Sequence, residues 1–461
     1  MPTVHVHSLE EAARLFQRDF GKTTEFTPMT LDPLKANAPT RRDAARRIMI
    51  VTDRYVPEIS AAATRLHAHA TRWISAGHSV DVVTCVPNFP AGKCFAGYTN
   101  GRHQVENQDG VSIHRVWSYM APNSGKYRRS LDYLSFPISA RLMAHKLPIP
   151  DVILASSPPI TVALAGQWLA RRFRRPWVFE VRDLWPASIR AVGAAKGGII
   201  DLIERYELGL YRKAAATIVL TDAFFQDITN RGIPAEKLRV VTNGVDLEPF
   251  KRSPSKSEAR LLLNVPQDKI VVGFVGTVGL AQGAGTFALA AGALKARPDI
   301  LFMCWGEGAD RRRVEAMVSE MGLSNIEFRN FLPQDQVPAI LASLDVATVL
   351  LKNDPVFETV IPSKIFEILA AGRPVAACVS GEAKKLIDRS GGGLCVSPED
   401  HEGLANVILQ YVDKPRTALD KAAAGSAFIA DAYSRDKLAA DALDVLLEVI
   451  DRDTRAHASL R

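Results

Sequence analysis

Short apolar runs alternate with helix-length amphipathic segments over most of this chain. The first two runs, IMIVTD (48–53) and SVDVVTC (79–85), flank a helical pattern that ends at Gly77. Further apolar runs before residue 225 lie at 111–117, 151–157, 177–183 and 216–222. Segments of helical length, such as 161–173 and 200–213, separate the later runs. This alternation is typical of a parallel sheet with helices on both faces.

The pattern stops at Asn243-Gly244 and a Pro- and Ser-rich stretch (249–257), and then starts again. The new apolar runs lie at 269–276, 300–306, 326–331, 346–351 and 374–380. Helical patterns lie between them at 286–294, 311–321, 337–344 and 363–371. We therefore predict an α/β fold with two doubly wound, Rossmann-like parallel-sheet domains facing a shared cleft at the carboxyl ends of their strands.

These patterns divide the chain into four predicted parts. Residues 1–45 show no sustained period and are expected to form a poorly ordered extension, with a short helix near Leu9–Phe16. Residues 46–248 form the first domain and residues 258–435 the second. Residues 436–461 form a C-terminal helix and tail, whose helical stretch Leu438–Val449 could pack across the hinge between the domains.

Composition narrows the class of protein. The 461 residues are 47% hydrophobic and 23% charged, which is ordinary for a globular chain and excludes collagen-like or wholly disordered proteins. An uninterrupted apolar run of about 18 residues does not occur, and acids stand where a signal peptide needs an apolar centre. The five cysteines are widely spaced and include no CxxC pair. We expect a cytoplasmic protein, and we include the inner face of the membrane in that location.

The net charge of +7 permits binding to nucleic acid, to anionic lipid headgroups or to phosphorylated small molecules. Most basic clusters read as solvated helix faces and linkers. One cluster, Lys126, Arg128 and Arg129, has the aromatic residues Tyr127 and Tyr133 nearby. We expect peripheral contact with an anionic membrane through this stretch, and no nucleic-acid partner.

Two strand ends offer candidate binding loops. After the first strand, Ser60-Ala61-Ala62 opens a helix, where backbone N–H groups could approach an anion or simply form a turn. In the second domain, Gly276, Gly279 and Gly283 are spaced much like a dinucleotide fingerprint, which alone is a weak signal. A dinucleotide site also needs an acidic residue at the end of the next strand. That residue is missing, so a nicotinamide cofactor is not expected.

The segment DPVFETVIPSKIFEILAAGRPVAACVS (354–380) is the most informative. Pro362 suits the first position of a helix whose apolar residues give it a buried face, and Glu367 lies among them in the second turn. A carboxylate there must reach solvent in the cleft or accept specific hydrogen bonds. Free N–H groups at the helix start, with Lys364, suit a diphosphate, and Glu367 suits ribose hydroxyls. The alternative is a surface glutamate on an amphipathic helix.

This segment resembles the nucleotide-binding signature of the retaining glycosyltransferases of family four, which have the GT-B fold. The likeness spans roughly residues 47–450 and includes IMIVTDRYVPEIS, EVRDLWP, VVTNGVD and GFVGTVGLAQG. VPNFPAGK, with RDLWP and AQG, is most similar to the branch that adds N-acetylated amino sugars such as fucosamine to lipid-linked bacterial polysaccharide precursors.

The resemblance implies roles for individual residues. Glu367 would bind the donor ribose, the loop Ile361, Pro362, Ser363 and Lys364 would lie against the diphosphate, and Asp183 would face the transferred sugar. Catalytic candidates are Asp183 and Lys364. The remaining predicted donor-binding residues are Thr359, Gly276, Thr277, Gln282, Gly306, Gly308 and Leu332, the last beside Phe331 at a strand end near the base. The acceptor or phosphate candidates are Ser60, Ala61, Arg65 and Arg182.

The sequence also departs from the family pattern at three positions. The family has two glutamates, and the first would fall at Thr359, with Glu358 one place out of register. The family's Arg and Lys after the first strand of the second domain are replaced by Thr277 and Gln282. The positive charge for the diphosphate must therefore come from elsewhere, with Lys364, Arg182 and Arg65 as candidates.

The resemblance implies transfer of a sugar, an N-acetylated amino sugar, from a UDP donor to a lipid-linked saccharide acceptor with retention, in cell-surface polysaccharide biosynthesis. We expect no cofactor and no metal, because the Asp-x-Asp pair Asp451 and Asp453 lies in the polar tail. Two alternatives stay open: a UDP-N-acetylhexosamine epimerase of the same architecture, and a non-catalytic nucleotide-sugar-binding protein.

Overall fold

The computed structural model describes residues 44–58, 60–89, 91–120, 126–184, 198–330 and 333–458. Residues 45–461 form one compact unit. The extension predicted for residues 1–45, with its helix near Leu9–Phe16, lies outside the described residues except for its last two positions. Among the described residues, none of the helices combines the length and the apolar character needed to span a bilayer.

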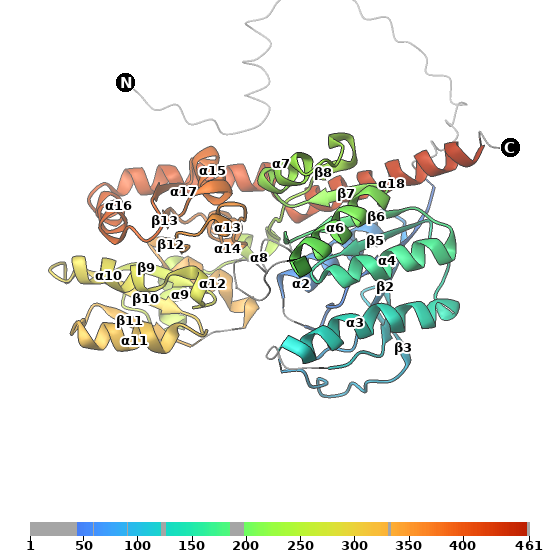
Figure 1. Ribbon diagram of the computed structural model, residues 1–461. Helices are drawn as coiled ribbons and strands as arrows, with labels where there is room; N and C mark the ends of the chain where they lie inside the picture. The colour runs from blue at the N-terminus through green and yellow to red at the C-terminus, as the bar shows by residue number, and fades with distance from the viewer. Residues whose placement is uncertain are drawn as a thin grey trace, which may run out of the picture. The chain divides into compact units, whose positions relative to one another are not determined.

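The first domain is built on an eight-stranded sheet with the strand order β3-β4-β2-β1-β5-β6-β7-β8 (Figure 1). Its strands are β1 (Arg47–Val51), β2 (Ser79–Cys85), β3 (His103–Gln108), β4 (Val111–Val116), β5 (Val152–Ser156), β6 (Trp177–Val181), β7 (Ala216–Val219) and β8 (Leu238–Val240). Its main helices are α2 (Ala61–Ser75), α3 (Lys126–Met143), α4 (Ile160–Phe173), α6 (Gly198–Lys213) and α7 (Asp222–Asn230). All pairings are parallel except β3 with β4.

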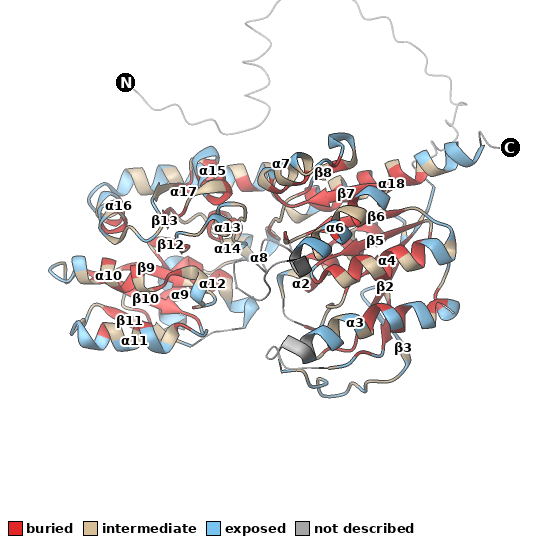
Figure 2. Cartoon of the chain, in the orientation of Figure 1, coloured by how far each residue is buried: buried red, intermediate tan, exposed pale blue. Residues whose placement is uncertain are grey.

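Burial on both faces explains the near-continuous apolar strands. The central strand β1 buries its last four residues, and β5 and β6 are buried throughout (Figure 2). One face packs against α3 and α4 through residues such as Phe136 and Leu169. The other face packs against α2 through Leu66 and Trp73. This confirms the predicted doubly wound sheet.

The antiparallel hairpin of β3 and β4 is an element that we did not predict. Its turn is Asp109-Gly110, in which both residues have positive φ angles of 51° and 82°. Asp-Gly between two strands is a known hairpin signal because both residues tolerate this backbone conformation. The sheet is therefore mixed at this edge.

The second domain is a six-stranded, parallel sheet with the order β11-β10-β9-β12-β13-β14. Its strands are β9 (Ile270–Val275), β10 (Ile300–Trp305), β11 (Ile326–Arg329), β12 (Val346–Leu350), β13 (Val375–Cys378) and β14 (Gly393–Val396). Its helices include α9 (Lys256–Leu262), α10 (Gly285–Ala293), α11 (Arg311–Glu320), α12 (Val337–Ser343), α13 (Pro355–Glu358), α14 (Lys364–Ala370), α15 (Gly381–Ser390), α16 (His401–Asp413) and α17 (Pro415–Ala432). The predicted second Rossmann-like domain is confirmed.

The last helix, α18 (Arg435–Ala458), returns to the first domain. Leu438, Val445 and Leu446 join the same apolar cluster as Trp73 of α2, and the Trp73 Nε1–H donates to the Ala439 carbonyl at 2.8 Å. The two crossings between the domains lie side by side, because the Val245 N–H donates to the Tyr433 carbonyl at 3.0 Å. The start of α18 is thereby held beside the second domain.

Candidate functional site

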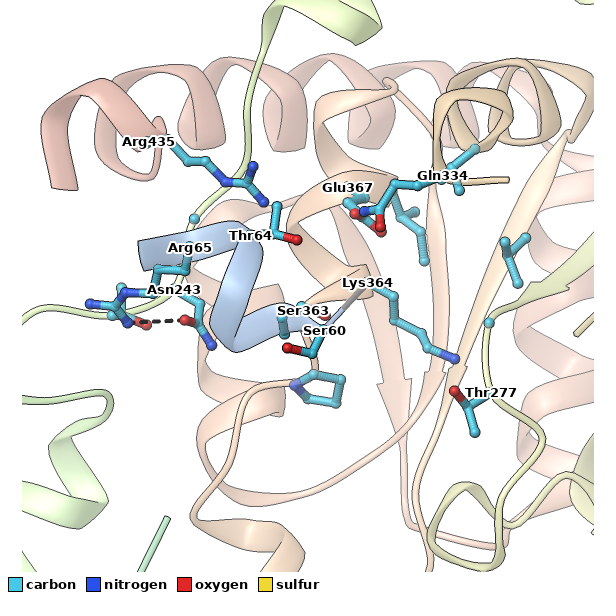
Figure 3. Close-up of a pocket in the computed structure, with 18 of the residues that line it drawn as sticks. Ser60, Thr64, Arg65, Asn243, Thr277, Gln334, Ser363, Lys364, Glu367 and Arg435 are labelled. Carbon is cyan, nitrogen blue, oxygen red and sulfur yellow. Dashed lines mark hydrogen bonds between the residues drawn. The ribbon is translucent and has the colours of Figure 1, made fainter. Parts of the chain in front are cut away.

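A cavity of about 510 Å³ lies where the carboxyl ends of the two sheets face each other (Figure 3). From the first domain it is lined by the start of α2 and by the crossing at 242–244. From the second domain it is lined by the end of β9, by the start of α14 and by Gln334 and Val337. Predicted site residues that line it are Ser60, Ala61, Arg65, Gly276, Thr277, Gln282, Pro362, Ser363, Lys364 and Glu367.

Helix α14 presents Lys364 and Glu367 to this cavity. Its apolar residues Ile365, Phe366, Ile368 and Leu369 are fully buried in the core of the second domain. Because those four residues fix the rotation of the helix, the two charged residues must face the cavity. The helix starts at Lys364, two residues after Pro362, so Glu367 lies in the first turn and not in the second.

The ammonium of Lys364 is buried and, within the described part of the chain, finds no hydrogen-bond partner. It lies 4.2 Å from the centre of the Phe274 ring, which attracts a cation through the ring face. Burial lowers the pKa of Lys364 to about 8. In Figure 3 its side chain extends towards Thr277. A buried charge without a hydrogen-bonding partner costs free energy. A protein typically carries such a group where a bound ligand supplies the missing partner.

Glu367 shares the cavity with Arg435, the first residue of α18. Burial raises the pKa of Glu367, while Arg435 and Lys364 oppose that rise. Burial also lowers the pKa of Arg435, and Asp246 and Glu367 counteract the decrease. Sequence reasoning missed Arg435. It lies far from the signature segment in the chain, and only the return of α18 to the first domain brings it here.

The start of α2 also opens onto the cavity. Ser60 is the N-cap of this helix, and its hydroxyl oxygen accepts a hydrogen bond from the Ala63 N–H at 3.2 Å. Ala61 and Thr64 line the cavity beside it. The small side chains leave the positive end of a 15-residue helix accessible to an anion.

Arg65 lines the cavity, but its guanidinium is already engaged by protein groups. It donates to His69 Nε2 at 3.0 Å, to Asn243 Oδ1 at 3.0 Å and to the Val241 carbonyl at 3.1 Å. It also forms an ion pair with the buried Glu180 at 3.0 Å. Its charge is thus balanced within the protein, and these contacts brace α2 against β6 and the domain crossing. The phosphate contact of Arg65 stays a prediction.

Five other predicted residues are described but do not line this cavity: Thr359, Ile361, Gly306, Gly308 and Asp183. The Thr359 hydroxyl donates to the Val356 carbonyl at 2.8 Å, and the Thr359 carbonyl accepts from the Thr221 hydroxyl of the first domain at 2.9 Å. A Cβ on Gly306 or Gly308 would collide with the backbone carbonyls of Gly276 and Val278. These two glycines therefore let the loop after β10 pack against the loop after β9.

Arg182 also does not line the cavity, and burial lowers its pKa to about 10. The predicted contact at Leu332, with Phe331, lies outside the described residues. In the described part of the chain, His, Cys, Asp and Glu side chains form no group of three or more able to hold a metal ion.

The sequence matches two protein-domain families. Residues 60–244 match the glycosyl transferase 4-like domain, and residues 269–414 match the glycosyl transferases group 1. A curated relative is the putative colanic acid biosynthesis glycosyl transferase WcaI of Escherichia coli K12. It is 25% identical over 382 residues, which cover 80% of this chain and 93% of that protein.

Solved structures share the two-domain architecture. Sucrose-phosphate synthase from Thermosynechococcus elongatus superposes with a TM-score of 0.70 at 18% identity, covering 88% of this chain and all of that one (100%). Anabaena HepE, solved in complex with UDP and glucose, superposes with a TM-score of 0.65 at 19% identity, covering 87% of this chain and 99% of that one.

Proposed function

This chain belongs to the family-four glycosyltransferases of GT-B fold, and from that premise we propose which transfer it performs. The donor is a UDP sugar, specifically an N-acetylated amino sugar, and the acceptor is a lipid-linked saccharide of cell-surface polysaccharide biosynthesis. The transfer retains the configuration at the anomeric carbon. Support for this setting comes from the relative WcaI, whose name places it in colanic acid biosynthesis.

The observation that carries the donor assignment is the buried ammonium of Lys364. It faces a cavity large enough for a ligand, and the described residues offer it no hydrogen-bond partner. A diphosphate would provide the negative charge and the acceptor atoms that this group lacks. Glu367, one turn along the same helix, would then accept hydrogen bonds from ribose hydroxyls. HepE, which has the same fold, was crystallised with UDP and glucose.

The chemistry that follows is stabilisation of a leaving group. The acceptor hydroxyl oxygen forms a bond to the anomeric carbon while the bond from that carbon to the diphosphate oxygen breaks. The proton of the hydroxyl passes to the departing diphosphate, and UDP is released. Negative charge develops on the leaving oxygen. Lys364 and the start of α2 both line the cavity and would stabilise this charge. Asp183, which follows β6 at the carboxyl edge of the first sheet, is the candidate that would lie beside the transferred sugar.

Metal independence is part of the proposal, since the positive charge at the diphosphate would come from Lys364 and from helix dipoles. A panel of nucleotide sugars tested for thermal stabilisation identifies the donor, because a ligand that binds only the folded state raises stability. Release of UDP is then measured with a lipid-linked saccharide, with and without EDTA. We expect UDP release that depends on the acceptor and continues in EDTA.

The same assay separates the alternatives. Interconversion of UDP-hexosamines without any acceptor would indicate an epimerase. Donor binding without turnover on any acceptor would indicate a binding protein. Loss of turnover in EDTA that magnesium or manganese restores would contradict metal independence.

A further inference from the structure

Helix α3 carries apolar residues on its outer surface as well as on its inner one. The inner face buries Phe136 and Ala140 against the first sheet. The outer face exposes four large aliphatic side chains, with exposed fractions from 48% to 63%: Leu131, Leu134, Ile138 and Leu142. Steps of three, four and four residues place them in a single row along the helix. A helix that only covered a sheet would carry polar residues there.

Other exposed apolar residues flank this helix in the sequence. Ile149 follows the helix, and Trp117 and Tyr119 precede it. The Tyr119 N–H donates to the Ser135 hydroxyl of α3 at 2.8 Å, which holds the aromatic loop against the helix. We call these seven residues the α3 stripe: Trp117, Tyr119, Leu131, Leu134, Ile138, Leu142 and Ile149.

Basic side chains border the α3 stripe. Arg128, Arg141, His145 and Lys146 are exposed on the same helix and the short turn after it. At the neighbouring end of α4, which packs beside α3, Arg171 and Arg172 are also exposed (Figure 1). An apolar row with an aromatic loop beside it and basic side chains at its border is typical of a helix lying in a membrane interface.

We propose that the α3 stripe docks this enzyme on the surface of an anionic membrane. A second copy of the chain fits this surface less well, because a symmetric contact would bring the basic borders of the two copies together. The part of the stripe on α3 is also small: a helix of this length offers a face of roughly 27 by 10 Å, about a third of the roughly 800 Å² per partner in a stable dimer.

The position of α3 connects this surface to the active site. The helix starts at the carboxyl edge of the first sheet, and its Asp132 is close enough to Asp53, just after β1, to influence the ionisation of that carboxyl group. A bilayer beneath α3 therefore lies near the edge that carries the cavity. This inference deepens the proposed function and rests on it, since a lipid-linked acceptor would be reached from that surface.

The test is flotation of the full-length chain on liposomes of neutral lipid alone and of neutral lipid with about a third phosphatidylglycerol. We expect binding to the anionic vesicles that weakens as salt rises. Leu134→Ser/Ile138→Ser should lower the partition coefficient at least about tenfold, because each leucine-sized side chain that enters the interface contributes more than that factor when fully buried. Arg141→Ala/Lys146→Ala should weaken binding at low salt and remove most of its salt dependence.

The matched control is Leu261→Ser/Leu262→Ser. Among the large aliphatic residues that the structure describes, these two leucines of α9 in the second domain are the most exposed, at 72% each, and they lie outside the α3 stripe. The control should float like the wild type. Equal loss in both double variants, or no vesicle binding by the wild type at low salt, would overturn the proposal. So would a dimer in solution that Leu134→Ser/Ile138→Ser dissociates.

Binding of UDP sugars is measured on the same preparations. If the protein binds UDP sugars but not vesicles, the docking proposal for the α3 stripe is refuted and the proposed function stands. Vesicle binding without affinity for any nucleotide sugar would refute the proposed function and leave the docking surface standing.

Discussion

Arg65 and Glu180 form an ion pair of 3.0 Å at the wall of the cavity, and both side chains are nearly inaccessible to solvent. Arg65 comes from α2 and Glu180 from β6. Glu180 also accepts a hydrogen bond from the Ser156 hydroxyl at 2.5 Å, and Arg65 reaches Asn243 and Val241 near the domain crossing. The pair therefore ties α2, the central strands and the crossing segment together.

Arg65→Met should destabilise the fold by about 3–5 kcal/mol, because it leaves the carboxylate of Glu180 buried without its partner. Urea unfolding gives this value. The double variant Arg65→Met/Glu180→Met should recover a large part of the loss, since no unpaired charge remains. A single variant that keeps its stability and loses only donor affinity would instead support the predicted phosphate contact of Arg65.

Lys364→Met should stabilise the donor-free protein by about 1–3 kcal/mol at pH 7, because burial of the ammonium opposes folding. The pKa in the folded state is about 8, below the ordinary value of 10.5. The penalty is therefore complete below pH 8 and disappears as the pH rises from 8 to 10.5. Thermal unfolding between pH 7 and 10 measures the difference. A melting temperature below that of the wild type would show that Lys364 has a stabilising structural role.

Donor affinity should fall as the pH rises through about 8, because only the protonated form of Lys364 can pair with a diphosphate. The loss approaches tenfold per pH unit until the higher pKa of the bound state is reached. Titration of a UDP sugar by calorimetry from pH 7 to 9 measures this. The profile should be flat in Lys364→Met, and a wild-type profile that is equally flat would contradict the role of this ammonium.

Glu367→Gln should weaken binding of a UDP sugar by about 10- to 100-fold, the range for hydrogen bonds to a charged group. The melting temperature should not fall, since burial already raises the pKa of Glu367 and disfavours its charge. The control is Glu358→Gln, in which an exposed carboxylate that contacts the Ser380 hydroxyl at 3.4 Å is replaced. It should change affinity less than about threefold, and equal losses in both variants would remove Glu367 from the ribose site.

Both sheets could be predicted from the sequence because helices cover both faces of each sheet. The strands are therefore nearly continuous apolar runs, which the sequence shows directly. Lys364 and Glu367 could be singled out because a local helix pattern places them next to buried neighbours. The features that sequence reasoning did not anticipate depend on contacts distant in the sequence. Arg435 reaches the cavity only because α18 packs on α2, and the engagement of Arg65 depends on Glu180 from another strand.

Other features have weak or ambiguous sequence signals. The Asp109-Gly110 turn was available as a hairpin signal, but the following strand alone was recognised. In α3, apolar residues occur on every side, so no periodicity tells which of them face the sheet. Gly306 and Gly308, which the resemblance places among the donor-binding residues, are required for close packing against a neighbouring loop.

The most direct test of the central claim, that Lys364 binds the donor diphosphate, compares UDP with uridine on the wild type, Lys364→Met and Lys352→Met. Lys352 belongs to the same domain and does not line the cavity. Calorimetry should show that Lys364→Met weakens UDP binding by about 10- to 150-fold and leaves uridine binding unchanged, because only UDP carries the charge that the ammonium pairs with. Lys352→Met should match the wild type for both ligands. Unchanged UDP affinity in Lys364→Met, or an equal loss for uridine, would contradict the account.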